Sequence, residues 1–275
     1  MSIPYAEVIG DPIIQSKSPV IHGLWLSTLG LAGDYRHAHV RPQDLADYIA
    51  QRRKDPDWRG CNVTMPHKQA IMPLLDRLDP LAEQVGAVNT VVPVDGQLVG
   101  FNTDVDGVAE PLRKLAIADG AHAYVIGAGG AARAGVVGVA KAGRFVVDVF
   151  NRTPEKADPL AVMAGAPNGK ARPLADLRPL QGGHHIILNA TSMGMGGQNP
   201  VPIDLAAFPA DTIVFDMVYA PLETPLLAQA RAQGLRTIDG LSMLIGQGAT
   251  AFERFFGAPP PREDDDAELR ALLTA

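Results

Sequence analysis

The chain has 275 residues, of which 47% are hydrophobic and 20% are charged, and its formal net charge is −6. This composition is typical of a folded globular protein of one or two domains and excludes a chain that is disordered throughout. An acidic balance without a Lys/Arg run argues against a nucleic-acid partner.

Three further features narrow the class of protein. The single cysteine, Cys61, excludes an intramolecular disulfide and a cysteine-based metal site. The N-terminus carries Glu7 and Asp11 and lacks the basic start of a signal peptide. Apolar runs end well short of the ~18 residues that a membrane helix needs. We therefore expect a cytoplasmic enzyme or binding protein with no membrane partner.

The first half of the chain alternates apolar strand-like segments with helical patterns. Strands are predicted at 5–9, 35–39, 60–63 and 88–92. A helix is predicted at 19–29, with Ser18 as N-cap and Gly30 closing its end. A second helix should begin near Pro66 and carry Ile71, Leu74, Leu75 and Leu78 on its apolar face. This alternation predicts an α/β fold with a parallel sheet.

A second α/β unit begins near residue 123. A strand at 123–126 leads into the sequence GAGGAARAG, a helix that extends to 142 and a strand at 145–150; later strands are predicted at 185–189 and 212–216. The helix near 105–115 is the expected junction between the two halves. A further helix should begin at Leu241, and the tail from Pro259 should be solvated with a short helical end.

The glycine-rich loop after the strand at 123–126 carries the most specific motif. Gly127, Gly129 and Ala132 fit G-x-G-x-x-G/A between a strand and a helix. The first small residue permits a tight turn, the second lets the backbone approach a pyrophosphate, and the third allows close packing of helix and strand. The pattern therefore predicts a dinucleotide site; the alternative is a glycine turn that serves packing alone.

The end of the next strand indicates which dinucleotide binds. NAD-binding chains usually place an acidic residue here, but Asp148 falls inside the strand, and Arg152 lies at its tip between Asn151 and Thr153. A guanidinium matches the oxygens of a 2′-phosphate. We therefore favour NADP over NAD, the alternative being that Arg152 is an ordinary loop charge.

Polar residues in the first half suggest a substrate site. Ser16 and Ser18 precede a helix and could hold a carboxylate, although Ser18 could be only an N-cap. Lys68 should lie in the first turn of the helix that begins at Pro66, where the helix dipole opposes a cation, so it is a candidate acid–base group; the alternative is a solvated lysine. Asp104 could pair with Lys68 or cap a helix.

The histidines are not assigned to chemistry. We expect packing or loop roles for His22 and His67. His184 and His185 start a strand without an acidic or cysteine partner at ligand spacing, so no metal is expected.

Ten segments together resemble the shikimate dehydrogenase family. They are SKSPVIH (16–22), NVTMPHK (62–68), GAVNTVV (86–92), NTD (102–104), GAGGAAR (127–133), NRT (151–153), NATSMGM (189–195), DMVY (216–219), TPLL (224–227) and DGLSMLIGQGA (239–249). The resemblance implies reversible reduction of 3-dehydroshikimate to shikimate with NADPH, in chorismate and aromatic amino-acid biosynthesis. It also implies a substrate domain, 1–104 plus 241–275, and a Rossmann-type NADP domain, 105–240, with a cleft between them.

The resemblance further implies individual roles. Lys68 would be the acid–base residue with Asp104 beside it. Substrate contacts would come from Ser16, Ser18, Thr64, Asn89, Asp104, Tyr219 and Gln247. Cofactor contacts would come from Gly127, Ala128, Gly129, Gly130, Ala131, Asn151, Arg152, Thr153, Met217 and Gly240. The expected assembly is a monomer or a homodimer.

Two departures from the family pattern leave alternatives open. Gly23 follows His22 where the family often has Asn, and Val105 and Asp106 follow Asp104 where it often has Gly. Asp106 would add an acid near the site. The alternatives are a quinate/shikimate dehydrogenase of looser specificity, a methylenetetrahydrofolate dehydrogenase, and a nucleotide-responsive regulator without turnover.

Overall fold

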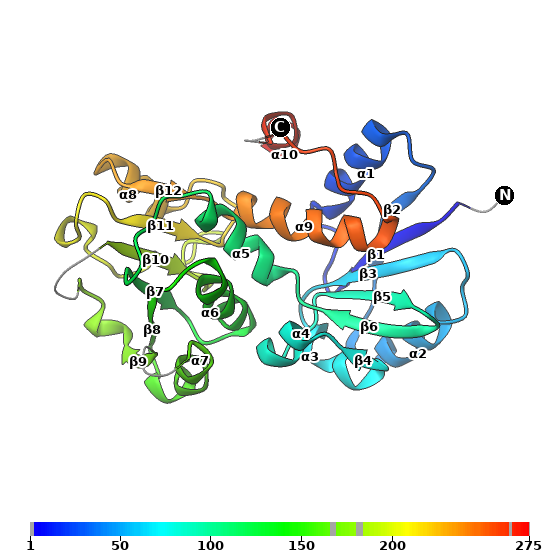
Figure 1. Ribbon diagram of the computed structural model, residues 1–275, viewed down its shortest axis with the longest axis horizontal. Coiled ribbons are helices and arrows are strands. Elements are labelled where there is room, and N and C mark those ends of the chain that lie inside the picture. The colour runs from blue at the N-terminus through cyan, green and yellow to red at the C-terminus, as the bar shows by residue number, and fades with distance from the viewer. Residues whose placement is uncertain (1–2, 166–168, 180–183, 264–265, 275) are drawn as a thin grey trace. The chain divides into compact units, whose positions relative to one another are not determined.

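The chain divides into two compact units, each built on a six-stranded sheet (Figure 1). The structure is a computed structural model that describes residues 3–165, 169–179, 184–263 and 266–274. The first unit comprises Met1–Thr103 and Gln247–Ala275, and the second comprises Asp104–Gly246. Among the described residues, no helix has both the length and the apolar character needed to cross a membrane.

The sheet of the first unit has the order β2-β1-β3-β5-β6-β4. Its strands are β1 (Tyr5–Gly10), β2 (Asp34–His39), β3 (Trp58–Val63), β4 (Arg77–Leu78), β5 (Thr90–Val94) and β6 (Gln97–Phe101). The predicted parallel pairing holds for β1 with β2 and β3, whereas β5 pairs antiparallel with both β3 and β6. Asp95 and Gly96 join β5 to β6 with positive φ at both residues, the conformation that closes a two-residue hairpin.

The helices of this unit range from four to twelve residues. They are α1 (Ser18–Leu29), α2 (Leu45–Arg52), α3 (His67–Ala70), α4 (Pro80–Val85), the part of α9 (Gly240–Phe256) from Gln247 onward, and α10 (Ala267–Thr274), with 3₁₀ turns η1 (Pro42–Asp44) and η2 (Met72–Leu74). Gly30 ends α1 with φ 61°, as predicted. The N-cap is Lys17 rather than Ser18, and Ser18 is the first helical residue.

The prediction of a long helix that begins near Pro66 is wrong. The chain forms only the single turn α3, then η2, and Leu78 lies in a strand that pairs with Gly100. Pro73 has no backbone N–H, so it cannot continue the ladder of i→i−4 hydrogen bonds beyond α3. Because the sheet uses Leu78, the apolar spacing that suggested one helix arises from two different elements.

The C-terminal tail is also less solvated than predicted. In α10, Leu269 and Leu273 are buried, and this helix packs against α1. Arg262 donates to both carboxylate oxygens of Asp266 at 2.9 and 2.6 Å. The tail is therefore part of the fold; Asp264 and Asp265 of its acidic cluster lie outside the described residues.

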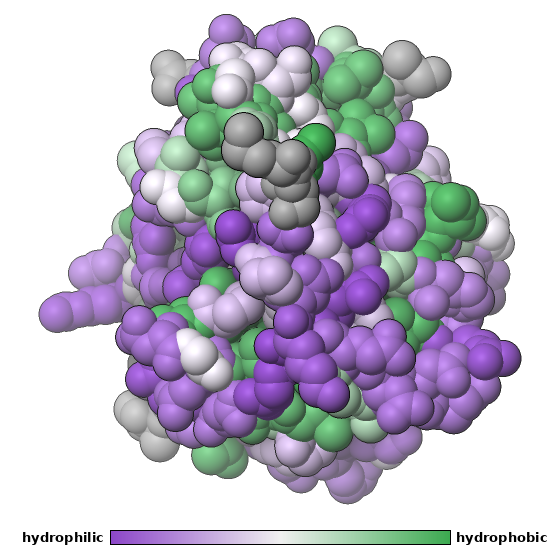
Figure 2. Space-filling model, turned by 90° about the vertical axis from the view of Figure 1, so that its right-hand side faces the viewer, coloured by the Kyte–Doolittle hydropathy of each residue, from purple (hydrophilic) through white to green (hydrophobic). Residues whose placement is uncertain are grey.

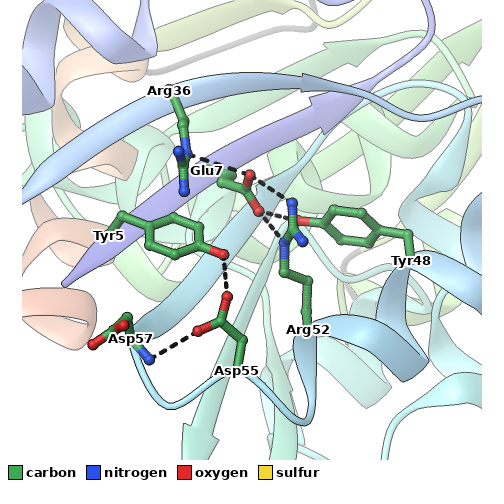
Figure 3. A network of polar contacts seen from close by, with 7 residues as sticks. All are labelled: Tyr5, Glu7, Arg36, Tyr48, Arg52, Asp55 and Asp57. Carbon is green, nitrogen blue, oxygen red and sulfur yellow. Dashed lines mark hydrogen bonds and ion pairs between the residues drawn. The ribbon is translucent and has the colours of Figure 1, made fainter. Parts of the chain in front are cut away.

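A buried carboxylate ties the outer strands of the first sheet to α2. Glu7, on β1, is 2% exposed and accepts hydrogen bonds from Arg52 at 2.7 and 3.0 Å and from the Tyr48 hydroxyl at 2.7 Å (Figure 3). Arg36 of β2 lies 3.6 Å from the same carboxylate. A buried charge needs such partners, and this cluster fixes the sheet edge to the helix beneath it.

The face of this unit seen in Figure 2 is mostly hydrophilic, with hydrophobic residues in small separate groups.

The second unit is a parallel sheet with the order β12-β11-β10-β7-β8-β9. Its strands are β7 (His122–Ile126), β8 (Val146–Asn151), β9 (Lys170–Pro173), β10 (His185–Asn189), β11 (Ile213–Asp216) and β12 (Arg236–Ile238). Counted from β7, this is the doubly wound order of the Rossmann fold. The direction of strand addition reverses between β7 and β10.

Helices and loops cover both faces of this sheet. They include α5 (Asp104–Arg113), α6 (Gly130–Ala142), α7 (Asp158–Met163), α8 (Pro225–Ala232) and the 3₁₀ turns η3 (Pro154–Lys156), η4 (Leu174–Asp176) and η5 (Leu205–Ala207). One hydrophobic cluster includes Val136 and Val125, and the other includes Tyr124 and Phe150. Burial of the strands on both faces explains why they are continuous apolar runs in the sequence.

Candidate active site

The glycine-rich loop has the geometry that its motif predicts. It follows β7 and enters α6, whose N-cap is Gly129. Gly127 has φ +117°, and a Cβ there would lie 2.9 Å from the Thr191 methyl group, so a larger residue would be strained. A Cβ at Gly129 or Gly130 would meet no atom within 4 Å. The loop therefore leaves its backbone open to a ligand at the start of a thirteen-residue helix, which suits a pyrophosphate.

The third small residue of the motif faces the interior. Ala132 is fully buried in the cluster beneath α6. The neighbouring Ala131 is exposed, and Ala128 packs partly against the same cluster. The loop thus separates a packing side from an open side, as a dinucleotide loop requires.

The tip of β8 presents a cation. Arg152 and Thr153 are exposed just beyond the strand, and Asn151 donates to the Thr153 carbonyl at 2.8 Å. Asp148 is 2% exposed and accepts a hydrogen bond from Arg172 at 2.8 Å. Because that carboxylate is buried and paired, it is not positioned as a ribose ligand, which agrees with the preference for a 2′-phosphate at Arg152.

Met217, Tyr219 and Gly240 follow the carboxyl ends of β11 and β12. Met217 and Tyr219 are half-buried, and burial raises the pKa of the Tyr219 phenol. A Cβ at Gly240 would lie 2.5 Å from the Val218 carbonyl oxygen. Only glycine allows this close approach of the two chain segments.

In the first unit, the two serines form a small hydroxyl cluster at the start of α1. The Ser16 hydroxyl donates to that of Ser18 at 3.2 Å, and it also accepts from the Ser18 amide at 3.3 Å. Ser16 is half-buried and Ser18 is 5% exposed. His37 contacts the Ser16 carbonyl at 2.9 Å, which fixes the loop. The hydroxyls are thus held together at a helix start.

Thr64 and Lys68 lie beyond the end of β3. Both are half-buried, and the Lys68 carbonyl accepts a hydrogen bond from the Val88 amide at 2.8 Å. The long helix expected behind Lys68 is absent, and a single turn carries only a small dipole. The predicted effect of a helix dipole on this lysine is therefore wrong, and the assignment of Lys68 as an acid–base residue depends on its position and on the family resemblance.

Asn89 is the centre of a buried hydrogen-bond network. Its amide donates to the Thr103 hydroxyl at 3.0 Å, and its side-chain oxygen accepts from the Thr103 amide at 2.7 Å. The Thr103 hydroxyl lies 3.4 Å from the Gln247 side-chain oxygen. On the other side, Asn62 donates to Thr90 at 3.0 Å and accepts from the Tyr35 hydroxyl at 2.6 Å. The network holds two predicted substrate residues, Asn89 and Gln247.

Two acidic residues, Asp104 and Asp106, lie in the first turn of α5. Asp104 is 7% exposed and is the first residue of α5 and of the second unit. Asp106 accepts a hydrogen bond from Lys141 of α6 at 2.7 Å. This second acid is therefore already paired within its own unit. The pairing of Asp104 with Lys68 stays a prediction.

Comparison with known proteins identifies the family. A model of the shikimate dehydrogenase substrate binding domain matches residues 8–91, and one of the shikimate 5′-dehydrogenase C-terminal domain matches residues 240–270. The chain is 54% identical to shikimate dehydrogenase (NADP(+)) of Sphingopyxis alaskensis, covering 99% of this chain and 97% of that protein. The chain belongs to the shikimate dehydrogenase family.

Two further relatives agree. Identity to shikimate dehydrogenase (NADP(+)) of Methylobacterium radiotolerans is 45%, over 100% of this chain and 98% of that protein. The crystal structure of shikimate 5-dehydrogenase from Thermus thermophilus, in complex with NADP(H) and shikimate, matches with a TM-score of 0.86 and 36% identity, covering 98% of each chain. The α/β fold and the Rossmann-type unit predicted for this shikimate dehydrogenase family member are thereby confirmed.

The predictions for His22 and His67 are also confirmed. His67 is 1% exposed and contacts the Val40 carbonyl at 2.6 Å. His22 is fully buried and stacks on Tyr35 with ring centroids 3.9 Å apart. Both are therefore packing residues of this family member.

Several polar residues that organise the site were not predicted to have a role in it. Tyr35, Asn62 and Thr103 belong to the Asn89 network, and Asn189 and Asp216 form a second network in the Rossmann unit. The available signal was a polar side chain inside or at the end of an otherwise apolar strand. Such a side chain needs a buried partner, and a single sequence does not name that partner.

Proposed function

We propose that this chain is an NADP-dependent shikimate dehydrogenase, which reversibly reduces 3-dehydroshikimate to shikimate with NADPH. The observation that carries the proposal is the 54% identity, along nearly the whole chain, to a relative of that name. Further support comes from a Rossmann unit with an open glycine loop and from a preformed cluster of hydroxyls and amides in the first unit.

Hydroxyl and amide groups would hold the substrate in an acidic protein. Ser16 and Ser18 offer two adjacent hydroxyls for a carboxylate, and hydrogen bonds to an ionised group are shorter and stronger than neutral ones. Thr64, Asn89 and Gln247 would contact the ring hydroxyls, with Asp104 and Tyr219 completing the set. The Asn89 network would orient this amide before substrate binds, which lowers the entropy lost on binding.

Lys68 is assigned the proton transfer. In the direction of reduction its ammonium donates a proton to the oxygen of the substrate carbonyl, and in oxidation the neutral amine accepts it. Asp104 would be its partner in this proton transfer. General acid–base groups of this kind contribute about 10²- to 10⁴-fold to turnover.

The second unit would hold NADP through three segments. Gly127–Ala131 would take the pyrophosphate at the start of α6, and Asn151–Thr153 would take the 2′-phosphate end of the adenosine. Met217 and Gly240 would border the nicotinamide. When bound, the reduced cofactor supplies the hydride that reaches the carbonyl carbon.

The reaction is tested by a spectrophotometric assay in which shikimate or quinate is offered with NADP or NAD and the reduced cofactor is followed at 340 nm. We expect the fastest turnover with shikimate and NADP. Equal or faster turnover of quinate would favour the quinate/shikimate branch, and cofactor binding without any turnover would favour a regulator.

Lys68→Met tests the acid–base assignment. We expect turnover to fall by about 10²-fold or more while NADPH affinity and the unfolding midpoint stay unchanged, because the amine would act only on the substrate. Lys54→Met, which removes an exposed lysine of the same unit, is the matched control. Turnover of Lys68→Met within about threefold of wild type would refute the role.

A further inference from the structure

The carboxyl edge of the second sheet has a reversal of strand order between β7 and β10. In open α/β sheets, ligands bind in the crevice beyond the carboxyl ends of the strands at such a switch point. The loops that leave β7, β10 and β11 therefore border the dinucleotide site. Whatever holds these three loops in one arrangement also shapes the cofactor site.

One carboxylate connects two of these loops. Asp216, the last residue of β11, is fully buried. Its Oδ1 accepts hydrogen bonds from the Asn189 side-chain amide at 2.9 Å and from the Val218 amide at 3.0 Å. Its Oδ2 accepts from the Thr224 hydroxyl at 2.6 Å. Three donors from three chain segments thus converge on one side chain.

Through Asn189, Asp216 acts on the loop after β10 and on the glycine loop. The Asn189 side-chain oxygen accepts from the amide and the hydroxyl of Thr191 at 3.1 and 2.7 Å. The Thr191 methyl group abuts Gly127, since a Cβ there would lie 2.9 Å from it. A chain of contacts therefore joins Asp216 to the first glycine of the dinucleotide loop.

Through Val218, the same carboxylate acts on the loop after β11. The bond to the Val218 amide fixes the backbone between Met217 and Tyr219. The carbonyl oxygens of Met217 and Val218 lie within 2.6 Å of a Cβ built on Gly240, so this backbone is packed closely against the start of α9. Thr224 in turn caps α8, because its hydroxyl accepts from the Leu227 amide at 3.3 Å.

We propose that Asp216 is a positioning residue for the cofactor: its buried carboxylate holds the loops after β10 and β11, and through Thr191 the Gly127 loop, in the arrangement that binds NADP(H). The inference deepens the proposed function and rests on it for the identity of the ligand. Because Asp216 is fully buried, we assign it no contact with the cofactor or the reacting atoms.

Two substitutions separate geometry from charge. In Asp216→Asn the amide oxygen can replace Oδ1 and accept from both Asn189 and Val218, and its NH₂ can donate to the Thr224 hydroxyl, which has acceptor capacity. Burial raises the pKa of Asp216, and its three hydrogen bonds oppose this effect. Since burial disfavours the charged form, the neutral asparagine side chain is compatible with this position. Asp216→Ala removes every acceptor and leaves the donors unsatisfied.

The matched control is Asp148→Ala in the same sheet. Asp148 is a buried carboxylate like Asp216, but it lies inside β8, where its side-chain partner among the described residues is Arg172. Its loss should destabilise the second unit without loosening the loops after β10 and β11.

The experiment titrates the purified protein with NADPH alone and follows nucleotide fluorescence. It also measures hydrogen exchange at the Thr191 and Val218 amides and at the Met193 amide, which donates to the Thr191 hydroxyl at 3.1 Å. We expect Asp216→Ala to weaken NADPH binding about tenfold or more, the size of one lost bond to a charged group, and to speed exchange at the three amides. Asp216→Asn and Asp148→Ala should stay within about threefold of wild type.

NADPH binding by Asp216→Ala equal to wild type would overturn the proposal, as would an equal loss in Asp148→Ala or in Asp216→Asn. If Asp216→Ala does not fold, Asn189→Ala removes the link to Thr191 and carries the same expectation. The binding titration contains no shikimate. A failure of the proposed reaction would therefore appear in the separate turnover assay, where a wild-type protein that binds NADPH would not oxidise shikimate with NADP.

Discussion

Acid should destabilise the first unit because of His22. The imidazole is fully buried, stacks on Tyr35 and packs edge-on against Trp25. Neither ring nitrogen has a hydrogen-bond partner among the described residues. Burial without a partner lowers the pKa of His22 from 6.5 to about 3. The folded unit therefore keeps His22 neutral across most of the acidic range.

The sign and size of the effect follow from proton linkage. Below pH 6.5 the unfolded chain binds a proton at His22 and the folded chain does not, so stability is lost as the pH falls from about 6.5 towards about 3. Each pH unit in this window costs about 1.4 kcal/mol. At pH 4.5, two units below the unfolded pKa, the loss from this group is about 3 kcal/mol.

The assay uses the two tryptophans as a reporter of this unit. Trp25 and Trp58 are the only tryptophans of the chain, and both are buried in the first unit. Urea unfolding followed by their fluorescence at pH 7.5, 6.5, 5.5 and 4.5 gives the free energy of unfolding of that unit. His22→Phe keeps an aromatic ring of similar size and removes the titration, so the fall from pH 7.5 to 4.5 should shrink by about 3 kcal/mol.

The control variant is His39→Gln, which removes a histidine whose side chain is 59% exposed. It retains His22 and should keep the steep acid loss of the wild type. Parallel pH profiles for wild type and His22→Phe would refute the reasoning, because they would mean that the folded unit protonates His22 as readily as the unfolded chain.

Two other substitutions test the remaining arguments. Arg152→Asp should shift the preference from NADPH towards NADH, because a carboxylate repels the 2′-phosphate. The ratio of kcat/KM for the two cofactors measures this shift, and Arg144→Asp, at another exposed arginine of the same unit, is the control. An unchanged ratio in Arg152→Asp would contradict the assignment. Arg52→Met should lower the free energy of unfolding of the first unit by about 3 kcal/mol, because it leaves Glu7 buried without its two-bonded partner. The control is Arg36→Met, which removes a half-exposed arginine 3.6 Å from Glu7 and should lower the free energy of unfolding by under ~1 kcal/mol in the same urea titration. Equal losses in the two variants would show that the bidentate Arg52–Glu7 pair is not the main contribution of this cluster to stability.

Local sequence signals predicted the parts of the fold that local chemistry determines. The turn at Gly30 needs a left-handed residue, and the loop at Gly127 needs small residues at three fixed positions. Both could be identified because the constraint and the residue that satisfies it are neighbours in sequence. The α/β character of the second unit followed from the alternation of apolar strands with a small-residue helix, and its Rossmann type from the family resemblance.

Elements that depend on distant partners could not be predicted in this way. Leu78 has the spacing of a helix but pairs with Gly100 as a strand, and Leu269 and Leu273 look like part of a solvated tail but pack on α1. The same pattern of apolar residues fits more than one local structure. Contacts that are remote in sequence decide between them.

The site shows the same division. Residue types and spacing selected Ser16, Lys68, Gly127 and Arg152 as candidates before any contact was known. The hydrogen bonds that orient the site join Asn89 to Thr103 and Asn189 to Asp216, pairs that only the pairing of strands brings together. Buried polar groups must find partners across the sheet, so the tertiary structure decided how the side chains of the site are held, whereas the sequence alone determined which chemical groups are available.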